Sequence, residues 1–290
     1  MAILVNKDTR VLVQGITGRV GSFQTKIMLD YGTKIVAGVT PGKGGTYVHD
    51  VPVYDLVEEA VDEHDVDIAL SFVPGRYAAD ASFEAIEARA NLVVILAAEI
   101  PNIDFMKVTK FADEQGVLIL GPDTPGVISP GKSKVGVHPN RMFTEGNVGV
   151  ISKSGALSYE TCKVLTEHGV GQSTVVGIGG GPMWGLTQAD VLEMFEQDEE
   201  TDVVVLLGEI GGKMEENAAE YIRKKMTKPV VSLIVGREAP KGKRMGHAGA
   251  IIQRGKGAAA DKIKALKDAG ALIAKSPEEI PQLTNSIRKE

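Results

Sequence analysis

The 290-residue sequence has little cysteine, few aromatic residues and no apolar run long enough to span a membrane. Its single cysteine, Cys162, excludes an intrachain disulfide, and its five histidines show no spacing typical of metal ligands. Asn6, Lys7 and Asp8 interrupt the apolar start of the chain, so we expect neither a signal peptide nor a membrane helix. These absences predict a soluble, cytoplasmic protein without a structural metal.

The sequence also lacks an excess of basic residues. Asp and Glu outnumber Lys and Arg by 38 to 32, which gives a formal net charge of −6 at pH 7. Such a chain is not expected to bind nucleic acid over a general surface, so we interpret its local basic clusters as sites for small anions. With 43% hydrophobic residues, the composition is that of an ordinary globular chain that is long enough for two domains.

Short apolar runs alternate regularly with helical patterns along the whole chain. The unbroken apolar run at residues 92–96 is typical of a parallel strand that is buried on both faces. This alternation predicts an α/β fold with parallel sheets. Two glycines and two prolines at residues 121–126 interrupt it, and we place a domain boundary there, between domains 1–122 and 123–290.

A glycine-rich turn follows the first predicted strand, residues 11–14. Gly15, Gly18 and Gly21 lead into a helical pattern, and amides at the start of such a helix would face a phosphate. The next predicted strand, residues 34–39, is followed by Lys43 and not by the carboxylate typical of NAD sites. This favours a ligand with a phosphate on its ribose, either coenzyme A or NADP; a flexible loop with a solvated lysine is the alternative.

Residues 126–133 match the phosphate-loop pattern Gly-x4-Gly-Lys-Ser. A working phosphate loop must open a helix, but residues 134–139 contain valines, a glycine and a proline. We therefore predict that this string does not bind a nucleotide.

Four loops of the second half follow predicted strands that end at one edge of a sheet. They carry Ser154 at a helix start, the glycines around Gly179, Glu209 and His247. In open α/β sheets, ligands bind at the carboxyl ends of the strands, so these loops should form one crevice.

His247 is the strongest candidate nucleophile in this crevice. Gly246 and Gly249 leave the ring approachable, and three cations upstream would attract an anion (Lys241, Lys243 and Arg244). The alternative is a basic surface loop with an inert histidine. Convergence of the four loops favours a functional histidine.

Several longer motifs occur together in this chain. They include Val-Thr-Pro-Gly-Lys-Gly-Gly at residues 39–45, Leu-Glu-Met-Phe-Glu at 192–196, Gly-Glu-Ile-Gly-Gly at 208–212 and Ala-Pro-Lys-Gly-Lys-Arg-Met-Gly-His-Ala-Gly-Ala-Ile-Ile at 239–252. From residue 2 to about residue 275, the chain resembles the α subunits of succinate–CoA ligases (succinyl-CoA synthetases). The resemblance implies an N-terminal Rossmann-like CoA-binding domain, followed by a flavodoxin-like, doubly wound parallel-sheet ligase domain.

The resemblance also implies roles for individual residues. His247 corresponds to the phosphorylated histidine, with Glu209 as its carboxylate partner. Residues expected near the substrate and the phosphate are Ser154, Gly155 and Tyr159. Residues at positions that bind coenzyme A are Thr17, Gly18, Arg19, Val20, Lys43, Leu96, Ala97 and Ala98.

A reaction and a partner follow from the same resemblance. ATP or GTP, held with Mg²⁺ by a β subunit, would exchange a phosphoryl group with His247 by way of succinyl phosphate. The thiol of coenzyme A, here a substrate, would then displace phosphate and give succinyl-CoA.

Alternatives stay open at the level of sequence. Ala98, Thr124 and Gly181 depart from the family pattern, so malate or another dicarboxylate could replace succinate, and the nucleotide and the number of αβ units are not fixed. An NADP-linked oxidoreductase would share the first sheet but leaves the converging loops of the second half unexplained. A non-catalytic CoA-binding module would never be labelled on histidine.

Overall fold

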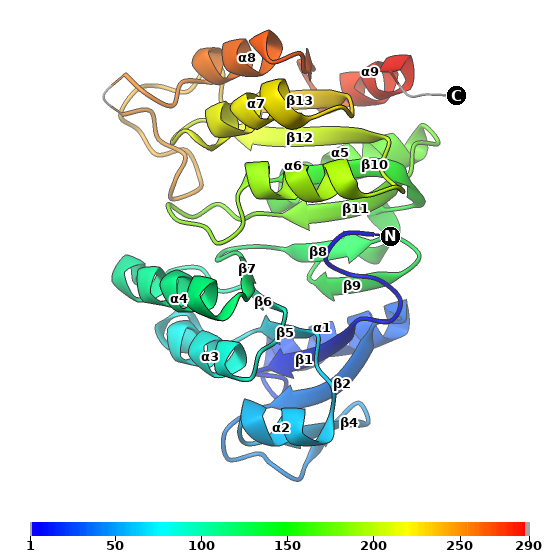
Figure 1. Ribbon diagram of the computed structural model, residues 1–290, viewed down its shortest axis with the longest axis vertical. Coiled ribbons are helices and arrows are strands. Elements are labelled where there is room, and N and C mark those ends of the chain that lie inside the picture. Colours follow the sequence, from blue (N-terminus) through cyan, green and yellow to red (C-terminus); the bar gives the residue numbers. More distant parts are fainter. Residues whose placement is uncertain (1, 254, 288–290) are drawn as a thin grey trace.

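A computed structural model of the chain describes residues 2–253 and 255–287. Two α/β halves follow one another along the long axis of the molecule, the N-terminal half at the bottom of Figure 1 and the C-terminal half at the top. The α/β prediction is therefore confirmed. The last strand of the first sheet ends at Leu120 and the first strand of the second begins at Gly126. The boundary between residues 122 and 123 stays a prediction, and the domain ends at residues 1 and 288–290 lie outside the described residues.

The first sheet has the strand order β3-β4-β2-β1-β5-β6-β7 within the described chain. Its strands are β1 (Arg10–Gln14), β2 (Lys34–Val39), β3 (Tyr47–Val48), β4 (Val51–Tyr54), β5 (Ile68–Ser71), β6 (Leu92–Ile95) and β7 (Leu118–Leu120). Its helices are α1 (Arg19–Tyr31), α2 (Val57–Glu63), α3 (Gly75–Glu87) and α4 (Asn102–Gln115). Helices α2, α3 and α4 cover the near face in Figure 1, and α1 lies behind the sheet.

The turn between β1 and α1 depends on its glycines. Gly15 has a positive φ of 77°, and the space where Gly21 would carry a Cβ is occupied by the Gly15 carbonyl group. A side chain at Gly21 would therefore push α1 away from the end of β1. The glycine spacing seen in the sequence is thus required for the close approach of this strand and helix.

The second sheet has the order β14-β13-β12-β10-β11-β8-β9 within the described chain. Its strands are β8 (Gly126–Ser129), β9 (Ser133–Gly136), β10 (Glu145–Ser152), β11 (Gln172–Gly177), β12 (Val203–Glu209), β13 (Val230–Val235) and β14 (Leu272–Ile273). Its helices are α5 (Gly155–Glu167), α6 (Gln188–Gln197), α7 (Met214–Lys225), α8 (Ala259–Asp268) and α9 (Ile280–Ile287), with 3-10 turns η1 (Asn140–Met142) and η2 (Pro277–Glu279). In Figure 1, α6, α7 and α8 cover the near face and α5 the far one, as in a doubly wound sheet.

Both sheets carry an antiparallel pair that the sequence reading did not contain. β3 pairs with β4, and the hairpin of β8 and β9 joins the edge of the second sheet through an antiparallel pairing with β11. The string at residues 126–133 forms this hairpin, with no helix after it, as predicted.

The β8–β9 hairpin also joins the two halves. Thr33, after α1, donates a hydrogen bond to the carbonyl oxygen of Lys134 (2.7 Å), and Ser129 Oγ donates to the carbonyl oxygen of Val5 (3.1 Å). The backbone N–H of Gly136 points to the sulfur of Met28 in α1 at 3.4 Å. These buried contacts fix the halves so that the loops after β11, β12 and β13 gather on the left of Figure 1, beside the end of α4.

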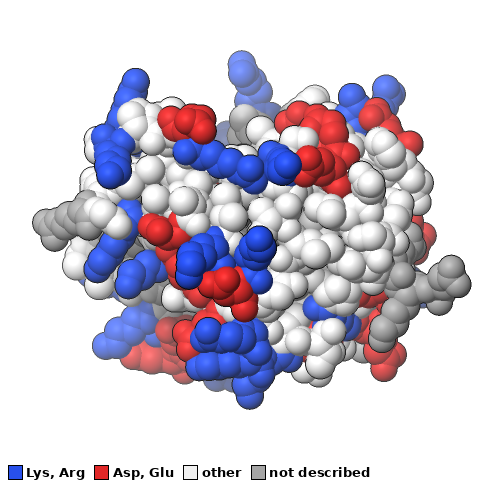
Figure 2. All heavy atoms as spheres, turned by 90° about the horizontal axis from the view of Figure 1, so that it is seen from above, with Lys and Arg blue, Asp and Glu red and all other residues white. Residues whose placement is uncertain are grey.

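Charges of both signs are interspersed on the end of the molecule that carries α8 and α9 (Figure 2). Groups of opposite sign adjoin one another, and neither sign forms a continuous field on this face. No helix among the described residues is long and apolar enough to cross a membrane.

Candidate active site

His247 and Glu209 form the centre of the candidate site. Glu209 is the last residue of β12, and His247 lies in the long loop between β13 and α8. His247 Nδ1 lies 2.7 Å from Glu209 Oε2, and the Glu209 side chain is 8% exposed while that of His247 is 30% exposed. The carboxylate can only accept, so Nδ1 carries a proton, and in the neutral ring Nε2 keeps a lone pair. Nε2 is the nitrogen that can attack an electrophile.

The His247 loop is folded back on itself. The backbone N–H of Met245 donates to the carbonyl oxygen of Ala250 (2.9 Å), and Gly246 between them has a positive φ of 79°. The backbone N–H of Gly249 donates to the carbonyl oxygen of Gly180 at 3.3 Å, which ties this loop to the loop after β11. Three of the four predicted loops therefore meet at His247.

The electrostatic surroundings favour a protonated imidazole. The hydrogen bond to Glu209 raises the pKa of His247 above its ordinary value, and burial of the ring opposes this effect. The negative charges of Glu209 and Asp123 raise the pKa further, while the positive charge of Lys153 lowers it. A positive charge that develops on the ring during a reaction is stabilised by the same carboxylates.

Gly180 is required by the close approach of the imidazole. A Cβ at this position would lie 2.8 Å from His247 Nδ1 and closer still to Cγ. We expect Gly180→Ala to displace the ring from Glu209 and to reduce phosphorylation of His247 by roughly 10- to 100-fold, as ångström-scale misplacement of a reacting group does. Rapid-quench labelling measures this rate.

Gly181→Ala is the matched control for that prediction. A Cβ there would meet the Met183 carbonyl oxygen at 3.2 Å and no atom of His247 within 4 Å. A labelling rate that falls equally in both variants would show that the effect of Gly180→Ala does not come from the ring.

Buried charged residues stand behind Glu209, and the sequence reading did not single them out. Lys153 directly follows β10, and its Nζ lies 3.4 Å from Glu209 Oε1 and 3.6 Å from Glu215 Oε1. Lys262, from α8, contacts the other oxygen of Glu215. In the sequence, Lys153 could have been noticed because it directly precedes the predicted turn at Ser154. In the sequence, Glu215 and Lys262 are charged residues within helical patterns, and such patterns do not indicate that these side chains are buried.

His247 lines a cavity of about 440 Å³ between the two halves of the chain. Both halves contribute to its wall, which includes Ala98, Glu99, Asp123, Gly181, Arg244 and His247. Burial raises the pKa of the Asp123 carboxyl, and Arg244 adds a cation to the same wall. The cavity can admit a small anionic molecule to the imidazole.

Ser154, Gly155 and Tyr159 lie together at the start of α5. Ser154 caps the helix by accepting a hydrogen bond from the backbone N–H of Leu157 at 3.3 Å. The Tyr159 hydroxyl lies 3.3 Å from the space that a Cβ of Gly155 would fill. Among the described residues, no hydrogen bond or ion pair joins these three to His247, while Lys153, the residue before Ser154, contacts Glu209. Their role toward substrate and phosphate stays a prediction.

A second cavity, of about 770 Å³, lies at the turn between β1 and α1. Thr17, Gly18, Arg19 and Val20 line it, as do apolar residues from the ends of the neighbouring strands (Val39, Phe72, Val73 and Pro74). Arg19 and Val20 are exposed at the first turn of α1, where the helix amides favour an anion. An elongated ligand with a phosphate and an apolar part fits such a wall.

The other predicted CoA-binding residues lie around this cavity without lining it. Lys43 is exposed in the turn after β2, which is held by hydrogen bonds from the Lys43 and Gly44 amides to Asp55 Oδ1 (2.9 and 2.8 Å). Leu96 and Ala97 follow β6. Ala98 lines the His247 cavity, and its carbonyl oxygen packs against Gly75, next to Pro74 of the larger cavity. Ala98 thus connects the wall of the His247 cavity to Gly75, the residue after Pro74.

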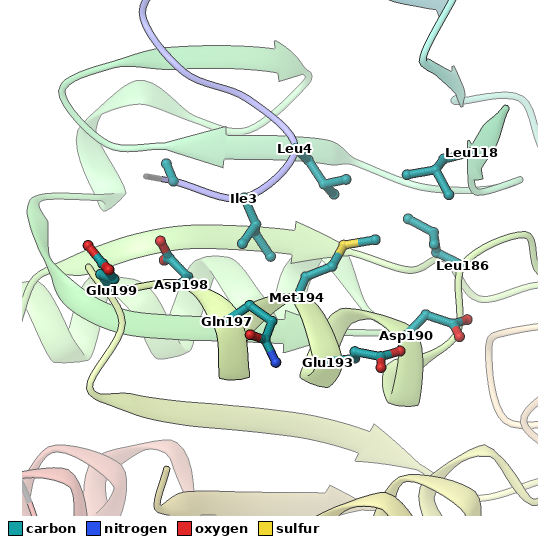
Figure 3. Close-up of a pocket in the computed structure, with 11 residues that line it drawn as sticks. Ile3, Leu4, Leu118, Leu186, Asp190, Glu193, Met194, Gln197, Asp198 and Glu199 are labelled. Carbon is teal, nitrogen blue, oxygen red and sulfur yellow. The ribbon is translucent and has the colours of Figure 1, made fainter. Parts of the chain in front are cut away.

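A further cavity, of about 810 Å³, lies between the N-terminal segment and α6 (Figure 3). The N-terminal segment with Ile3 and Leu4 faces α6, whose Glu193, Met194 and Gln197 lie along the opposite side. None of the predicted site residues lines it. Over residues 2–253 and 255–287, no group of three or more His, Cys, Asp or Glu residues could hold a metal ion.

Two family profiles match different parts of the chain. The profile described as CoA binding domain matches residues 6–99, and the one described as CoA-ligase matches residues 151–272. The first range contains the turn between β1 and α1, and the second contains Glu209 and His247.

Curated relatives match over nearly the full length. The chain is 60% identical to succinate–CoA ligase [ADP-forming] subunit alpha 1 of Archaeoglobus fulgidus, over 95% of this chain and 94% of that one. It is 52% identical to the corresponding subunit alpha of Aquifex aeolicus, over 100% and 95% of the two chains. A solved structure of ATP citrate lyase from Methanothrix soehngenii, in complex with citrate and coenzyme A, is similar with a TM-score of 0.88 and 25% identity. The match covers 99% of this chain and 52% of that one, so the chain spans about half of that enzyme.

Proposed function

The chain belongs to the family of succinate–CoA ligase α subunits, and from this premise we propose that it is the phosphoryl-accepting subunit of an ADP-forming succinate–CoA ligase. The hydrogen bond of 2.7 Å between His247 Nδ1 and Glu209 Oε2, at the wall of a cavity, carries this proposal. It leaves Nε2 as a nucleophile for a phosphoryl group and gives the developing cation a buried counter-charge.

His247 takes the phosphoryl group on Nε2 and later gives it up to the succinate carboxylate. Glu209 holds the Nδ1 proton throughout, so the ring never has to lose it to solvent. Ser154 and Gly155 start α5, and the positive end of this helix stabilises the phosphoryl oxygens. Tyr159 closes the side of this turn, and burial raises the pKa of its hydroxyl group, which keeps it a hydrogen-bond donor.

Coenzyme A binds as a substrate and supplies the thiol that takes over the succinyl group. Thr17, Gly18, Arg19 and Val20 hold its phosphates at the start of α1. Lys43 contributes a cation from the turn after β2, while Leu96, Ala97 and Ala98 guide the thiol end from the larger cavity toward His247. The close approach of the Ala98 carbonyl oxygen to Gly75, next to Pro74 of the larger cavity, supports this path, as does the presence of coenzyme A in the similar structure of ATP citrate lyase.

A β subunit completes the enzyme. The name subunit alpha in the relatives implies a second subunit, and the string at residues 126–133 forms a hairpin that offers no phosphate loop. We assign ATP and Mg²⁺ to the β subunit.

The assembled enzyme tests the proposed function. The chain, mixed with a β subunit, ATP, Mg²⁺, succinate and coenzyme A, should form succinyl-CoA and release ADP. Parallel reactions with malate and with GTP test the alternative acid and nucleotide. Failure to form any thioester in the presence of a β subunit would contradict the proposal.

Replacement of Lys43 should weaken coenzyme A binding and leave phosphorylation of His247 intact. The lysine lies in an exposed turn after β2, and loss of a charge-assisted contact of roughly 1.5–3 kcal/mol corresponds to about a tenfold or greater loss of affinity. Isothermal titration of Lys43→Ala with coenzyme A measures it. Titration with 3′-dephospho-coenzyme A is the control. An equal loss of affinity for both ligands would show that Lys43 does not contact the ribose phosphate.

A further inference from the structure

A chain of buried charges continues inward from the His247–Glu209 pair. Lys153 Nζ lies 3.4 Å from Glu209 Oε1 and 3.6 Å from Glu215 Oε1, with side-chain exposures of 1% for Lys153 and 0% for Glu215. Lys262, also fully buried, contacts Glu215 and lies 3.0 Å from Glu216 Oε2. Among the described residues, these inner side chains contact Glu209 and one another, and no hydrogen bond or ion pair joins them to His247.

Each oxygen of Glu209 has its own neighbour. Oε2 accepts from His247, and Oε1 faces the ammonium group of Lys153. The backbone N–H of Glu209 donates to Glu215 Oε1 at 3.2 Å, so Glu215 holds both the backbone of Glu209 and the lysine that faces its side chain. This arrangement restricts the carboxylate to one orientation.

Lys153 also contacts the opposite wall of the site. Its Nζ lies 5.0 Å from the centre of the Trp184 ring, a cation–π distance. Trp184 Nε1 donates to the carbonyl oxygen of Gly179 at 2.9 Å, next to the Gly180 that packs against the imidazole. The Lys153 ammonium group therefore contacts both the Glu209 carboxylate and the loop with Trp184 and Gly180, and these two elements hold the His247 ring in place.

The charges balance only when the imidazole is positive. The three carboxylates at residues 209, 215 and 216 exceed the two ammonium groups by one, so the cluster carries one negative charge while the ring is neutral. The positive charge of Lys153 lowers the pKa of His247, so the number of cations behind Glu209 affects how strongly the imidazole holds a second proton.

We propose that Lys153 is a positioning residue that acts on His247 through Glu209: its ammonium group holds Oε1, so that Oε2 accepts the Nδ1 proton while Nε2 remains an unprotonated nucleophile. This inference rests on the proposed phosphorylation of His247. Without Lys153, two buried carboxylates lie together with one cation fewer, and His247 retains its second proton up to a higher pH.

The predicted pH dependence includes every charged group that faces the pair. Lys153, Glu215, Lys262 and Glu216 lie behind it, and Glu99, Asp123 and Arg244 line the cavity in front. Removal of Lys153 should shift the rise of the phosphorylation rate to higher pH by about one unit, which lowers the rate near neutral pH by about tenfold. Removal of the Glu215 charge should shift the rise to lower pH, because Lys153 then faces Glu209 alone.

The experiment uses the chain assembled with a β subunit and three variants: Lys153→Met, Lys153→Arg and Glu215→Gln. Rapid-quench labelling of His247 from ATP and Mg²⁺ is measured from acid to alkaline pH, with coenzyme A affinity as a check on the first half of the chain. Lys153→Arg should keep the wild-type profile, since it keeps the charge. Lys134→Met is the matched control, because Lys134 is also buried in the second sheet but contacts Asn140 at 2.9 Å.

Opposite shifts in Lys153→Met and Glu215→Gln support the proposal, and a mere loss of packing would not produce them. A wild-type pH profile in Lys153→Met would overturn it, as would the same shift in Lys134→Met. If Lys153→Met does not fold, the acid shift in Glu215→Gln decides by itself. NMR titration of His247 in the full chain distinguishes failure of this proposal from failure of the proposed function. The titration reports the proton affinity of the imidazole even when no phosphorylation occurs. A pH shift in Lys153→Met without any phosphorylation would contradict the proposed function and not the role of Lys153.

Discussion

Replacement of His247 with asparagine should abolish phosphoryl labelling of the chain and thioester formation by the assembled enzyme. The imidazole Nε2 is the only ring nitrogen left free by the bond from Nδ1 to Glu209, and asparagine offers no comparable nucleophile. Removal of a nucleophile that forms a covalent intermediate typically costs on the order of 10⁴-fold or more in rate. Labelling with the β subunit, ATP and Mg²⁺ measures the loss.

The chemistry of the label identifies its site. A phosphoramidate on histidine is labile in acid and stable in base, whereas a phosphoserine is not, and alkaline mass spectrometry should place the phosphate on the peptide with Gly246 and His247. His168→Asn is the control, because His168 ends α5, where its Nδ1 contacts the Val164 carbonyl oxygen (2.8 Å). Full labelling of His247→Asn, or efficient labelling of the wild-type chain without a β subunit, would contradict the proposed function.

Much of the fold could be predicted from the sequence because parallel strands buried on both faces read as apolar runs. All the residues of β10 from Val148 onward and all those of β12 are buried, and both strands stand out in the sequence. The pairing of short strands could not be predicted in the same way. β3 has two residues and β8 four, and such runs do not indicate which neighbour they join or in which direction.

The two central site residues could be predicted because Glu209 ends one strand of the sheet and His247 follows the next. Position along the chain places Glu209 and His247 at one edge, and the structure brings them to 2.7 Å. The charges behind them could not be predicted, since burial of Glu215 depends on the rotation of α7 against the sheet. Its neighbour Glu216 is charged in the same way but is partly exposed.

The coenzyme A residues show a similar difference. Thr17, Gly18, Arg19 and Val20 share one turn and line one cavity, so a local motif was sufficient to group them. Ala98 lines the His247 cavity instead, because the path of the loop after β6 is set by its contact with Gly75 in α3. A contact between distant loops has no local signal in the sequence. The cytoplasmic location predicted from the absence of targeting segments stays a prediction.

Glu209 sets the state of His247 by two separate effects. Its hydrogen bond fixes the proton on Nδ1, and its charge raises the pKa of the ring. Glutamine at this position removes the charge, and its amide group can present an N–H to Nδ1, which would move the ring proton to Nε2 and block the nucleophile.

Glu209→Gln should therefore reduce the rate of His247 phosphorylation by roughly 10²- to 10⁴-fold, the range seen when the carboxylate partner of a catalytic histidine is replaced. Coenzyme A affinity should stay within about twofold of wild type, because Glu209 does not line the cavity at α1. The residual rate should begin to rise at lower pH than in the wild type, since a histidine without its carboxylate loses its proton more readily. Rapid-quench labelling across pH and isothermal titration with coenzyme A measure the two quantities.

Asp123→Asn provides the comparison. Asp123 also raises the pKa of His247 by its charge, and it lines the same cavity as His247. Its replacement should therefore shift the pH profile in the same direction as Glu209→Gln, with a much smaller loss of rate. A labelling rate in Glu209→Gln equal to that of the wild type would remove Glu209 from the mechanism, and equal losses in the two variants would reduce its role to that of one negative charge among others.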